Sequence, residues 1–266
     1  MVTDAKTSQK SSQTFILKVY RGSPGNQYWE SFRLPLVPSL NVISALMRVQ
    51  KEPVNADGVR VTPVVWEQGC LEEVCGSCSM LIDRVPRQAC SALIAELLRD
   101  SGTNCVLLAP LSKFPLIRDL IVDRSAMFNN LKKVHAWVES DGAYDRGGGP
   151  KIYQAKQERL YQLSTCMTCG CCAEACPQVN EHSSFMGPAA IAQADLFNHT
   201  PMGEPTKPDR MRALMEEGGI QGCGNAQNCV RVCPKKIPLT DSIASVGRDA
   251  TAAAIQELLG LGYRGK

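Results

Sequence analysis

The segment that decides the fold of the first half of this 266-residue chain is Cys70-Leu71-Glu72-Glu73-Val74-Cys75-Gly76-Ser77-Cys78. Its three cysteines are separated by four residues and then by two. This spacing is typical of a loop that wraps thiolates around a planar [2Fe–2S] centre. Gly69 and Gly76 allow the tight backbone turns that such a loop needs. The segment therefore predicts a two-iron site of the plant-ferredoxin type.

The fourth ligand of this site must come from outside the segment, and two cysteines follow it. Cys90 ends the return arm of a predicted hairpin that starts at Cys78, which brings it back beside the loop. Cys105 lies in an apolar strand, where a buried and inert thiol is the more common role. Spacing alone leaves both open, and the hairpin argument favours Cys90.

The residues around this loop alternate in a pattern that is mainly typical of strands. Strands are expected at residues 15–21, 28–34, 64–66, 79–82, 85–89 and 104–108. Two helices are expected, at residues 41–50 and 91–99, with Asn41 able to cap the first. This order suits a small mixed sheet that grips a helix, which is a β-grasp fold.

A second cysteine group reads Cys166-x2-Cys169-x2-Cys172-x3-Cys176-Pro177. This is the bacterial ferredoxin run, in which three thiolates hold one [4Fe–4S] cube and the fourth reaches a different cluster. Cys171 also lies in this run, but it is out of register, and we interpret it as a bystander.

A third group, Cys223-x5-Cys229-x3-Cys233-Pro234, repeats this run with Ala226 in place of its middle cysteine. A cube that lacks one ligand tends to lose the iron at that corner, so the group predicts a [3Fe–4S] site. The expected ligands of this site are Cys223, Cys229 and the crossing Cys176. Cys233 then crosses back to complete the [4Fe–4S] set with Cys166, Cys169 and Cys172.

The second half of the chain has a helical pattern, so the predicted fold class is α+β. Helices are expected at residues 151–164, 188–197, 207–217 and 239–259. Glycines at 147–149 and a proline at 150 predict a hinge. The expected division is a loose tail at 1–13, a [2Fe–2S] ferredoxin domain at 14–140, and an all-α ferredoxin domain with the other two clusters at 141–266.

Composition limits the alternative uses of the thirteen cysteines. The polar start of the chain has no secretory signal, which disfavours a disulfide scaffold. Two runs ending in Cys-Pro are rarely zinc sites, and no CxxxCxxC run of a radical enzyme occurs. A net charge of +3 with scattered basic residues predicts no nucleic-acid partner. No apolar stretch is long enough to span a bilayer.

Several further stretches, taken with the cysteine groups, indicate a family. They are Asn41-Val42-Ile43-Ser44-Ala45-Leu46-Met47, Arg87-Gln88-Ala89-Cys90-Ser91-Ala92-Leu93, Lys113-Phe114-Pro115-Leu116-Ile117-Arg118-Asp119-Leu120 and Phe185-Met186-Gly187-Pro188-Ala189-Ala190. Over nearly its whole length after the tail, the chain resembles the iron–sulfur subunits of succinate dehydrogenase and of quinol:fumarate reductase. The resemblance implies Cys90 as the fourth [2Fe–2S] ligand.

The resemblance also implies partners and a place in respiration and the tricarboxylic acid cycle. A separate flavoprotein with FAD would oxidise succinate, so no catalytic residue is expected on this chain. Electrons would pass through the three clusters to a quinone beside a membrane-anchor cytochrome b subunit, which often carries haem b. This arrangement implies a peripheral position on the cytoplasmic face of a bacterial membrane. Fumarate reductase, running in the reverse direction, is the alternative, and a free-standing ferredoxin-like carrier is a more distant one.

One departure from the family pattern concerns the quinone. Relatives that use ubiquinone carry a tryptophan pair shortly after the Cys-Pro of the second group and a histidine after the first cysteine of the third. Here these places read Gln178-Val179-Asn180 and Gly224. The chain therefore looks more similar to the menaquinone-using, Bacillus-type branch.

Overall fold

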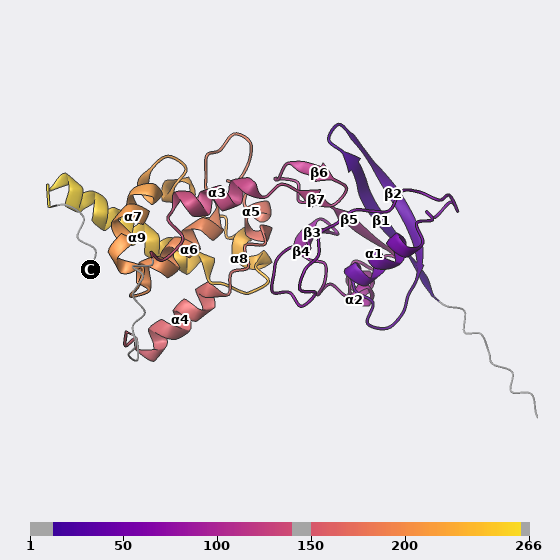
Figure 1. Cartoon of the computed structure of the whole chain (residues 1–266), viewed down its shortest axis with the longest axis horizontal. Helices are drawn as coiled ribbons and strands as arrows, with labels where there is room; N and C mark the ends of the chain where they lie inside the picture. Colours follow the sequence, from indigo (N-terminus) through magenta and orange to yellow (C-terminus); the bar gives the residue numbers. More distant parts are fainter. Residues whose placement is uncertain (1–12, 140–149, 262–266) are drawn as a thin grey trace, which may run out of the picture.

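The computed structural model describes residues 13–139 and 150–261, in which a sheet-containing half lies beside a helical half (Figure 1). Five strands form one mixed sheet in the order β2-β1-β5-β3-β4. Their bounds are β1 Thr14–Ser23, β2 Asn26–Pro35, β3 Ser79–Ile82, β4 Val85–Gln88 and β5 Cys105–Ala109. β1 runs antiparallel to β2 and parallel to β5, while β3 is antiparallel to both β4 and β5. The sheet agrees with the predicted β-grasp half.

Two helices, α1 (Val42–Lys51) and α2 (Ile94–Ser101), share the core of this sheet. Side chains of β1 alternate between buried and half-buried, with Phe15, Leu17 and Val19 fully buried. Burial of such side chains supplies most of the stability of a sheet of this size. The predicted cap is present: Asn41 Oδ1 accepts from the Ser44 amide at 2.7 Å. Its Nδ2 donates to the Cys90 carbonyl at 2.9 Å, which anchors the residue expected to be a cluster ligand.

Two sequence predictions in this half were wrong. Residues 64–66 form no strand, because the Val65 amide donates to the Asp119 carboxylate at 2.9 Å rather than to a neighbouring strand. Val64 is nonetheless buried, so an apolar pattern there reflected burial and not sheet pairing. The helix expected from residue 91 begins at Ile94, and no side chain caps it. The hydroxyl of Ser91 donates instead to Glu73 in the cysteine loop, at 2.8 Å.

The segment after β5 has more structure than its sequence pattern indicated. It contains a small hairpin, β6 (Leu116–Arg118) and β7 (Ile121–Val122), followed by α3 (Ser125–Lys133). Asp119, at the hairpin turn, has a φ of 47°. Its carboxylate lies 3.3 Å from the buried guanidinium of Arg21, which also pairs with Glu30 at 2.5 Å. This long-range ion pair fixes the hairpin onto β1. A local sequence pattern could not have predicted it, because its two residues are far apart in the chain.

The helical half is built from six helices and two short 3₁₀ turns among the described residues. Their bounds are α4 Gln154–Ser164, α5 Cys171–Ala175, α6 Pro188–His199, η1 Glu204–Thr206, α7 Lys207–Met215, η2 Ile220–Gly222, α8 Asn228–Val232 and α9 Leu239–Leu258. The four long helices were predicted to within a few residues. The expected hinge glycines lie outside the described residues, as does the expected domain boundary at 140–141.

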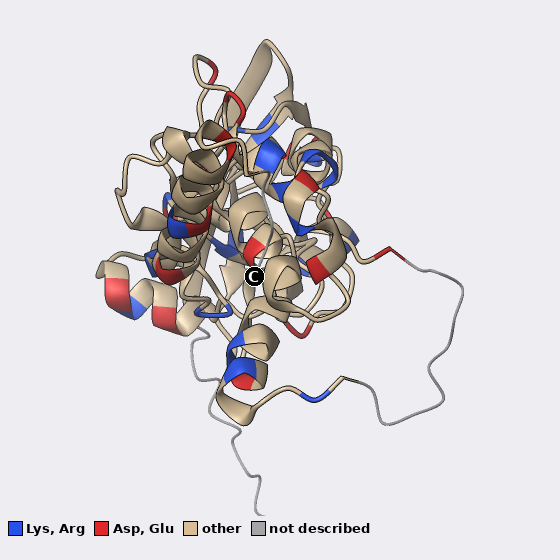
Figure 2. Cartoon of the chain, turned by 90° about the vertical axis from the view of Figure 1, so that its left-hand side faces the viewer, with Lys and Arg blue, Asp and Glu red and all other residues tan. Residues whose placement is uncertain are grey.

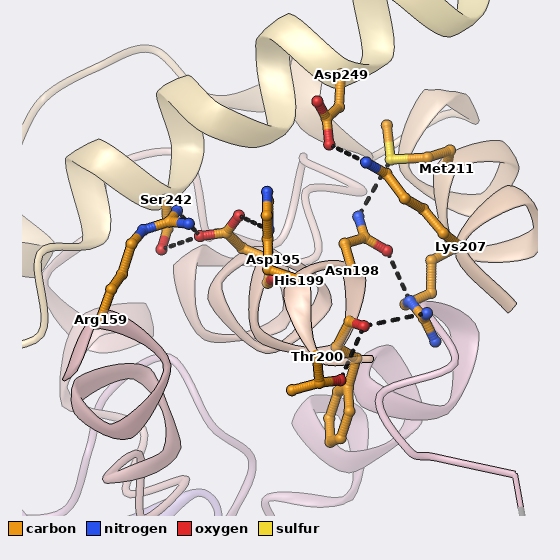
Figure 3. Close-up of polar contacts among 11 residues, drawn as sticks. Arg159, Asp195, Asn198, His199, Thr200, Lys207, Met211, Ser242 and Asp249 are labelled. Carbon is orange, nitrogen blue, oxygen red and sulfur yellow. Dashed lines mark hydrogen bonds and ion pairs between the residues drawn. The ribbon is translucent and has the colours of Figure 1, made fainter. Parts of the chain in front are cut away.

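Helix α6 is the central element of this half and contacts α4, α7 and α9. Figure 3 shows the polar contacts that hold it. Asp195, fully buried on α6, accepts from Arg159 of α4 at 2.5 Å and from Ser242 of α9 at 2.8 Å. The Nδ1 of His199 lies 3.1 Å from the other carboxylate oxygen. One carboxylate therefore joins three helices.

A second buried group lies at the end of α6 (Figure 3). The Arg210 guanidinium of α7 donates to Asn198 Oδ1 at 2.7 Å and to the Gly203 carbonyl. Lys207, one turn earlier, pairs with Asp249 of α9 at 2.7 Å. Buried polar groups are tolerated where they find partners, and these contacts fix the order in which α6, α7 and α9 pack.

The two halves meet at α5. The Glu174 carboxylate, buried on α5, accepts from the backbone amides of Ser112 and Lys113, each at 3.0 Å. A small apolar cluster continues the junction, joining Leu111, Phe114 and Ala173. Hydrogen bonds and apolar packing at this junction together hold the cysteines of the first half against those of the second.

Two surface properties complete the description. No helix in the described ranges is long and apolar enough to cross a membrane. On the end of the helical half that faces the viewer in Figure 2, Lys and Arg are mixed with Asp and Glu. Charges of both signs interspersed in this way are typical of a solvated surface.

Candidate metal centres

The first cysteine segment forms an irregular loop whose backbone turns around its own sulfur atoms. Leu71, Glu73 and Gly76 have φ values of 62°, 56° and 74°, so the chain turns in a left-handed sense at each. Three amides consequently point at Cys70 Sγ, those of Glu72, Val74 and Cys75, at 3.2–3.3 Å. N–H donors of this kind stabilise a thiolate and tune the clusters that thiolates hold. The loop therefore fits a cluster.

The thiol of Cys75 has the electrostatics of a metal ligand. Hydrogen bonds from the Cys70 backbone and from Ser77 lower the pKa of Cys75 to about 6. The thiolate, rather than the thiol, is the form that binds metal. Cys75 is exposed, so the loop stands open to solvent or to a partner at this point.

The fourth position of this site separates the two candidate cysteines. Cys90 follows β4, and its thiol lies beside that of Cys78, where burial and this neighbour raise the pKa of Cys78 to about 12. Cys105 lies in β5, where burial raises the pKa of its thiol and the nearby charges are Lys18 and Asp83. The structure thus brings Cys90 to the loop and leaves Cys105 apart. Cys105 is half-buried, less so than its apolar surroundings predicted.

The second site is a cavity of about 380 Å³, its open mouth included. The cysteines that line it are Cys166, Cys169, Cys172 and Cys233. Burial and the nearness of the other thiols raise the pKa of Cys172 and Cys166. In the absence of metal these groups are therefore neutral thiols. As ligands they would be thiolates, and the irons of a cluster would compensate their charge.

The third site is a neighbouring cavity of about 340 Å³. It is lined by Cys176, Cys223 and Cys229, and Ala226 lines it as well. Burial raises the pKa of Cys229, and Cys176 and Cys223 contribute as the nearest thiols. The lining of this cavity thus includes three thiols and the methyl group of Ala226, whereas the lining of the second site includes four thiols.

Both cavities lie at the starts of the same two helices. Pro188 and Thr240, in the first turns of α6 and α9, line the third site, and Ala189 and Leu239 line the second. A helix N-terminus carries a partial positive charge and unpaired N–H groups. Iron–sulfur clusters with thiolate ligands are anions, so two helix dipoles favour their binding here.

The predicted cysteines are distributed over three places in the structure. Within the described ranges, no three His, Cys, Asp or Glu side chains converge as they would on a single metal ion. The predicted cysteines stand instead around a loop and two cavities.

The backbone of the first site, at Gly76, lies close to the backbone of the second site, at Met167 and Cys169. A Cβ added to Gly76 would lie 2.6 Å from the Met167 carbonyl oxygen and 2.9 Å from Cys169 Cα. The Gly76 carbonyl accepts from Arg124 at 2.9 Å, and this arginine also pairs with Glu67 at 2.8 Å. Sequence reasoning did not single out Arg124, because its role depends on a contact between distant segments.

Cys171, interpreted from its spacing as a bystander, lies between the first two sites. It is fully buried, and its thiol is close enough to Cys169 to lower the pKa of Cys169 to about 7. Nε2 of Gln88, at the end of β4, lies 3.6 Å from the Cys171 sulfur. Sequence reasoning missed Gln88, although alternation in the 85–89 strand could have placed it facing inward.

These features define a class of protein. A β-grasp half with a thiol-lined loop, followed by a helical half with two thiol-lined cavities, is the architecture of a multi-cluster iron–sulfur protein. A model of the 2Fe-2S iron-sulfur cluster binding domain matches residues 16–129. A model of the 4Fe-4S dicluster domain matches residues 162–237. The predicted α+β fold class is thereby confirmed.

Curated relatives then identify the family. The succinate dehydrogenase iron-sulfur subunit of Bacillus subtilis is 49% identical over 253 residues, which cover 95% of this chain and 98% of that protein. The fumarate reductase iron-sulfur subunit of Wolinella succinogenes is 27% identical, over 87% of this chain and 95% of that protein. The chain belongs to the family of succinate dehydrogenase iron–sulfur subunits, which confirms the resemblance drawn from its sequence.

A solved structure supports the same fold. A chain from the Mycobacterium smegmatis Sdh1 complex in the apo form superposes with a TM-score of 0.77. The two are 22% identical, and the match covers 91% of this chain and 97% of that one. Both halves of the architecture are therefore present in that chain as well.

Proposed function

We propose that this chain is the electron-transfer subunit of a membrane-bound succinate:quinone oxidoreductase. FAD on a separate flavoprotein takes electrons from succinate, and the clusters of this chain carry them one at a time to a quinone. The chain itself holds, spaces and tunes the clusters. The observation that carries the proposal is the pair of adjacent cavities, one lined by four cysteines and the other by three.

The proposed ligand sets follow this geometry. The [2Fe–2S] cluster is held by Cys70, Cys75, Cys78 and Cys90. The [4Fe–4S] cluster is held by Cys166, Cys169, Cys172 and Cys233, and the [3Fe–4S] cluster by Cys176, Cys223 and Cys229. Support for the three-iron assignment comes from Ala226, which lines the third cavity but offers no ligand.

Exposed apolar side chains support a subunit role over that of a free carrier. Leu71 and Val74, in the loop of the first site, are 45% and 59% exposed. A second set, Ile255, Leu258 and Leu259, lies at the end of α9 and is 53–86% exposed. Exposed apolar groups of this kind are typical of surfaces that partners cover. We assign these partners as the flavoprotein and a membrane-anchor cytochrome b subunit, which holds the chain at the cytoplasmic face of the membrane.

The proposed quinone is menaquinone. Gln178 and Gly224, the positions that depart from the ubiquinone pattern, both line the third cavity. A Cβ at position 224 would lie 2.5 Å from Gln178 Nε2, so a histidine there would have to displace this amide. The two departures are therefore coupled in space. The reverse reaction is less favoured, since identity is 49% to a dehydrogenase subunit and 27% or 32% to fumarate reductase subunits.

Low-temperature EPR of the anaerobically purified holoprotein, with an iron count, tests the proposal. We expect about nine irons per chain, a [3Fe–4S] signal in the oxidised state and a [2Fe–2S] signal after reduction. A protein with no iron and no visible absorption would refute it. In the native complex, we expect succinate oxidation to be faster with a menaquinone analogue than with a ubiquinone analogue. A strong preference for ubiquinone would contradict the quinone assignment alone.

A further inference from the structure

Gln88 is a fully buried carboxamide at the point where the first and second sites meet. It ends β4, two residues before Cys90, and β4 contacts both α5 and α8 of the helical half. A buried amide must find hydrogen-bond partners, because a buried polar group without a partner is destabilising. Its partners are therefore informative.

Both ends of this amide face groups that lie at the first site or between the first and second sites. Oε1 accepts from the Cys78 thiol at 3.5 Å, and Nε2 donates to the Ser79 hydroxyl at 2.8 Å. Nε2 also lies 3.6 Å from the Cys171 sulfur. Cys171 is in turn within hydrogen-bonding reach of Cys169. A continuous buried path thus leads from Cys78 to Cys169.

Cluster binding changes what this path requires. As a ligand of iron, Cys78 is a thiolate and has no proton to donate to Oε1. Two acceptors would then face each other at 3.5 Å. A half-turn of the carboxamide resolves the conflict, since its oxygen and nitrogen ends occupy nearly the same volume. Nε2 then donates to the Cys78 thiolate.

The other end of the turned amide also finds a partner. Oε1 takes the position from which it can accept the Ser79 hydroxyl proton. In the structure the Ser79 hydroxyl donates to the Gly76 carbonyl at 2.7 Å. When this hydroxyl turns to Oε1, the Gly76 carbonyl still accepts from Arg124 at 2.9 Å. The Cys171 proton remains available to Cys169. The turned arrangement therefore leaves none of these groups without a partner.

We propose that Gln88 is a positioning residue of the first cluster, whose amide donates an N–H···S hydrogen bond to the Cys78 thiolate and raises the reduction potential of that cluster. This inference rests on the proposed function. The extra electron of a reduced cluster increases the negative charge on its sulfurs, so a donor stabilises the reduced form more than the oxidised form. Cys70 receives backbone donors, which substitutions other than proline leave in place, whereas Cys78 faces a side-chain amide that a substitution can remove.

Replacing Gln88 by Met tests the proposal, because methionine has similar length and volume but no N–H. The readout is the midpoint potential of the first cluster, from an EPR-monitored redox titration of the holoprotein. We expect the ratio of reduced to oxidised cluster at a fixed potential to fall about tenfold, which equals about 59 mV for a one-electron couple. The matched control is Gln193→Met in α6, whose half-buried amide donates to the Leu163 carbonyl and should leave this potential unchanged.

A second measurement needs no variant. Pulsed EPR on reduced, unmodified protein with ¹⁵N confined to glutamine side chains should detect a weak nitrogen coupling to the first cluster. Absence of this coupling overturns the inference even if Gln88→Met fails to load its cluster, and so does an unchanged potential in a loaded variant. Absence of any first-cluster signal in the unmodified protein would instead contradict the proposed function.

Discussion

The second and third cavities are built from the same parts but end with different thiol counts. Each takes residues from the first turns of α6 and α9, and each receives a cysteine that is followed by a proline. The second presents four thiols, while the third presents three and the methyl group of Ala226. Helix dipoles and packing are therefore shared. The two sites differ in thiol count because position 226 holds an alanine where the second run has its middle cysteine, Cys169.

The largest expected effect separates the sites through their crossing cysteines. Cys176→Ala leaves the third cavity with two thiols, and we expect it to lose that cluster, with iron falling from about nine to about six per chain. Cys233→Ala leaves the second cavity with three thiols, so it should lose only about one iron and show a second [3Fe–4S] signal. An iron count and low-temperature EPR measure both results.

The crossing assignment also has a contrary outcome. If Cys176→Ala removed the [4Fe–4S] signal and kept the [3Fe–4S] signal, each run would hold its own cluster and the crossing would be wrong. Cys105→Ser is the matched control, because Cys105 lies in β5 and the groups that act on its thiol are Lys18 and Asp83. This variant should keep about nine irons per chain.

A smaller effect is expected from making the two cavities alike. Ala226→Cys supplies the missing thiol, so we expect the third site to gain about one iron and to give a [4Fe–4S] signal with a lower potential. Quinone reduction by the complex should slow as a result. An unchanged rate in a variant with a converted cluster would show that the third site is not on the electron path.

The smallest expected effect is a loss of stability from changing a carboxylate on α6, the helix whose first turn lines both cavities. Asp195 joins α6 to α4 and α9. Asp195→Asn leaves the partly exposed Arg159 without its partner, and we expect a loss of about 2 kcal/mol in the free energy of unfolding. Denaturant unfolding of the holoprotein measures it. Asp209→Asn, which breaks an exposed pair with Arg212 on α7, should change little; an equal loss in both would remove the special role of Asp195.

The Asp195 carboxylate should also make the stability of the protein depend on pH in the acid range. Burial alone would raise the pKa of Asp195, but His199, Arg159 and Ser242 together outweigh it and hold this pKa below its ordinary value. A carboxylate with a lowered folded-state pKa adds stability above its unfolded-state pKa of about 3.9. That stability is lost as pH falls through the folded-state value. Wild-type protein should therefore lose more stability than Asp195→Asn between neutral pH and pH of about 3.

The sequence was most informative where chemistry fixes spacing. Strands and helices with clear periodicity, such as β1 and α9, were predicted nearly at their observed bounds. The cysteine sets predicted from spacing are the ones that the structure gathers around one loop and two cavities. Asn41 was found because capping is a local hydrogen bond between residues three positions apart.

The remaining features depend on contacts between distant segments. Residues 64–66 are β-branched and aromatic, which favours a strand, yet a carboxylate from Asp119 takes the hydrogen bond that a strand would need. The spacing of Cys171 shows only that it is out of register, because its surroundings come from β4 in the other half. Gln88 and Arg124 are ordinary residues in the sequence, and only the docking of the halves places them beside the sites.

Gly76 has a consequence for the speed of electron movement. Electron tunnelling rates fall exponentially with distance, so the gap between the first two clusters is a quantity that the fold must limit. At Gly76 this gap is limited by main chain against main chain, because even one methyl group would lie 2.6 Å from the Met167 carbonyl oxygen. The two halves can come no closer, and any side chain here would hold them further apart. We therefore expect a larger residue at position 76 to widen the gap between the first two sites and to slow electron transfer between them.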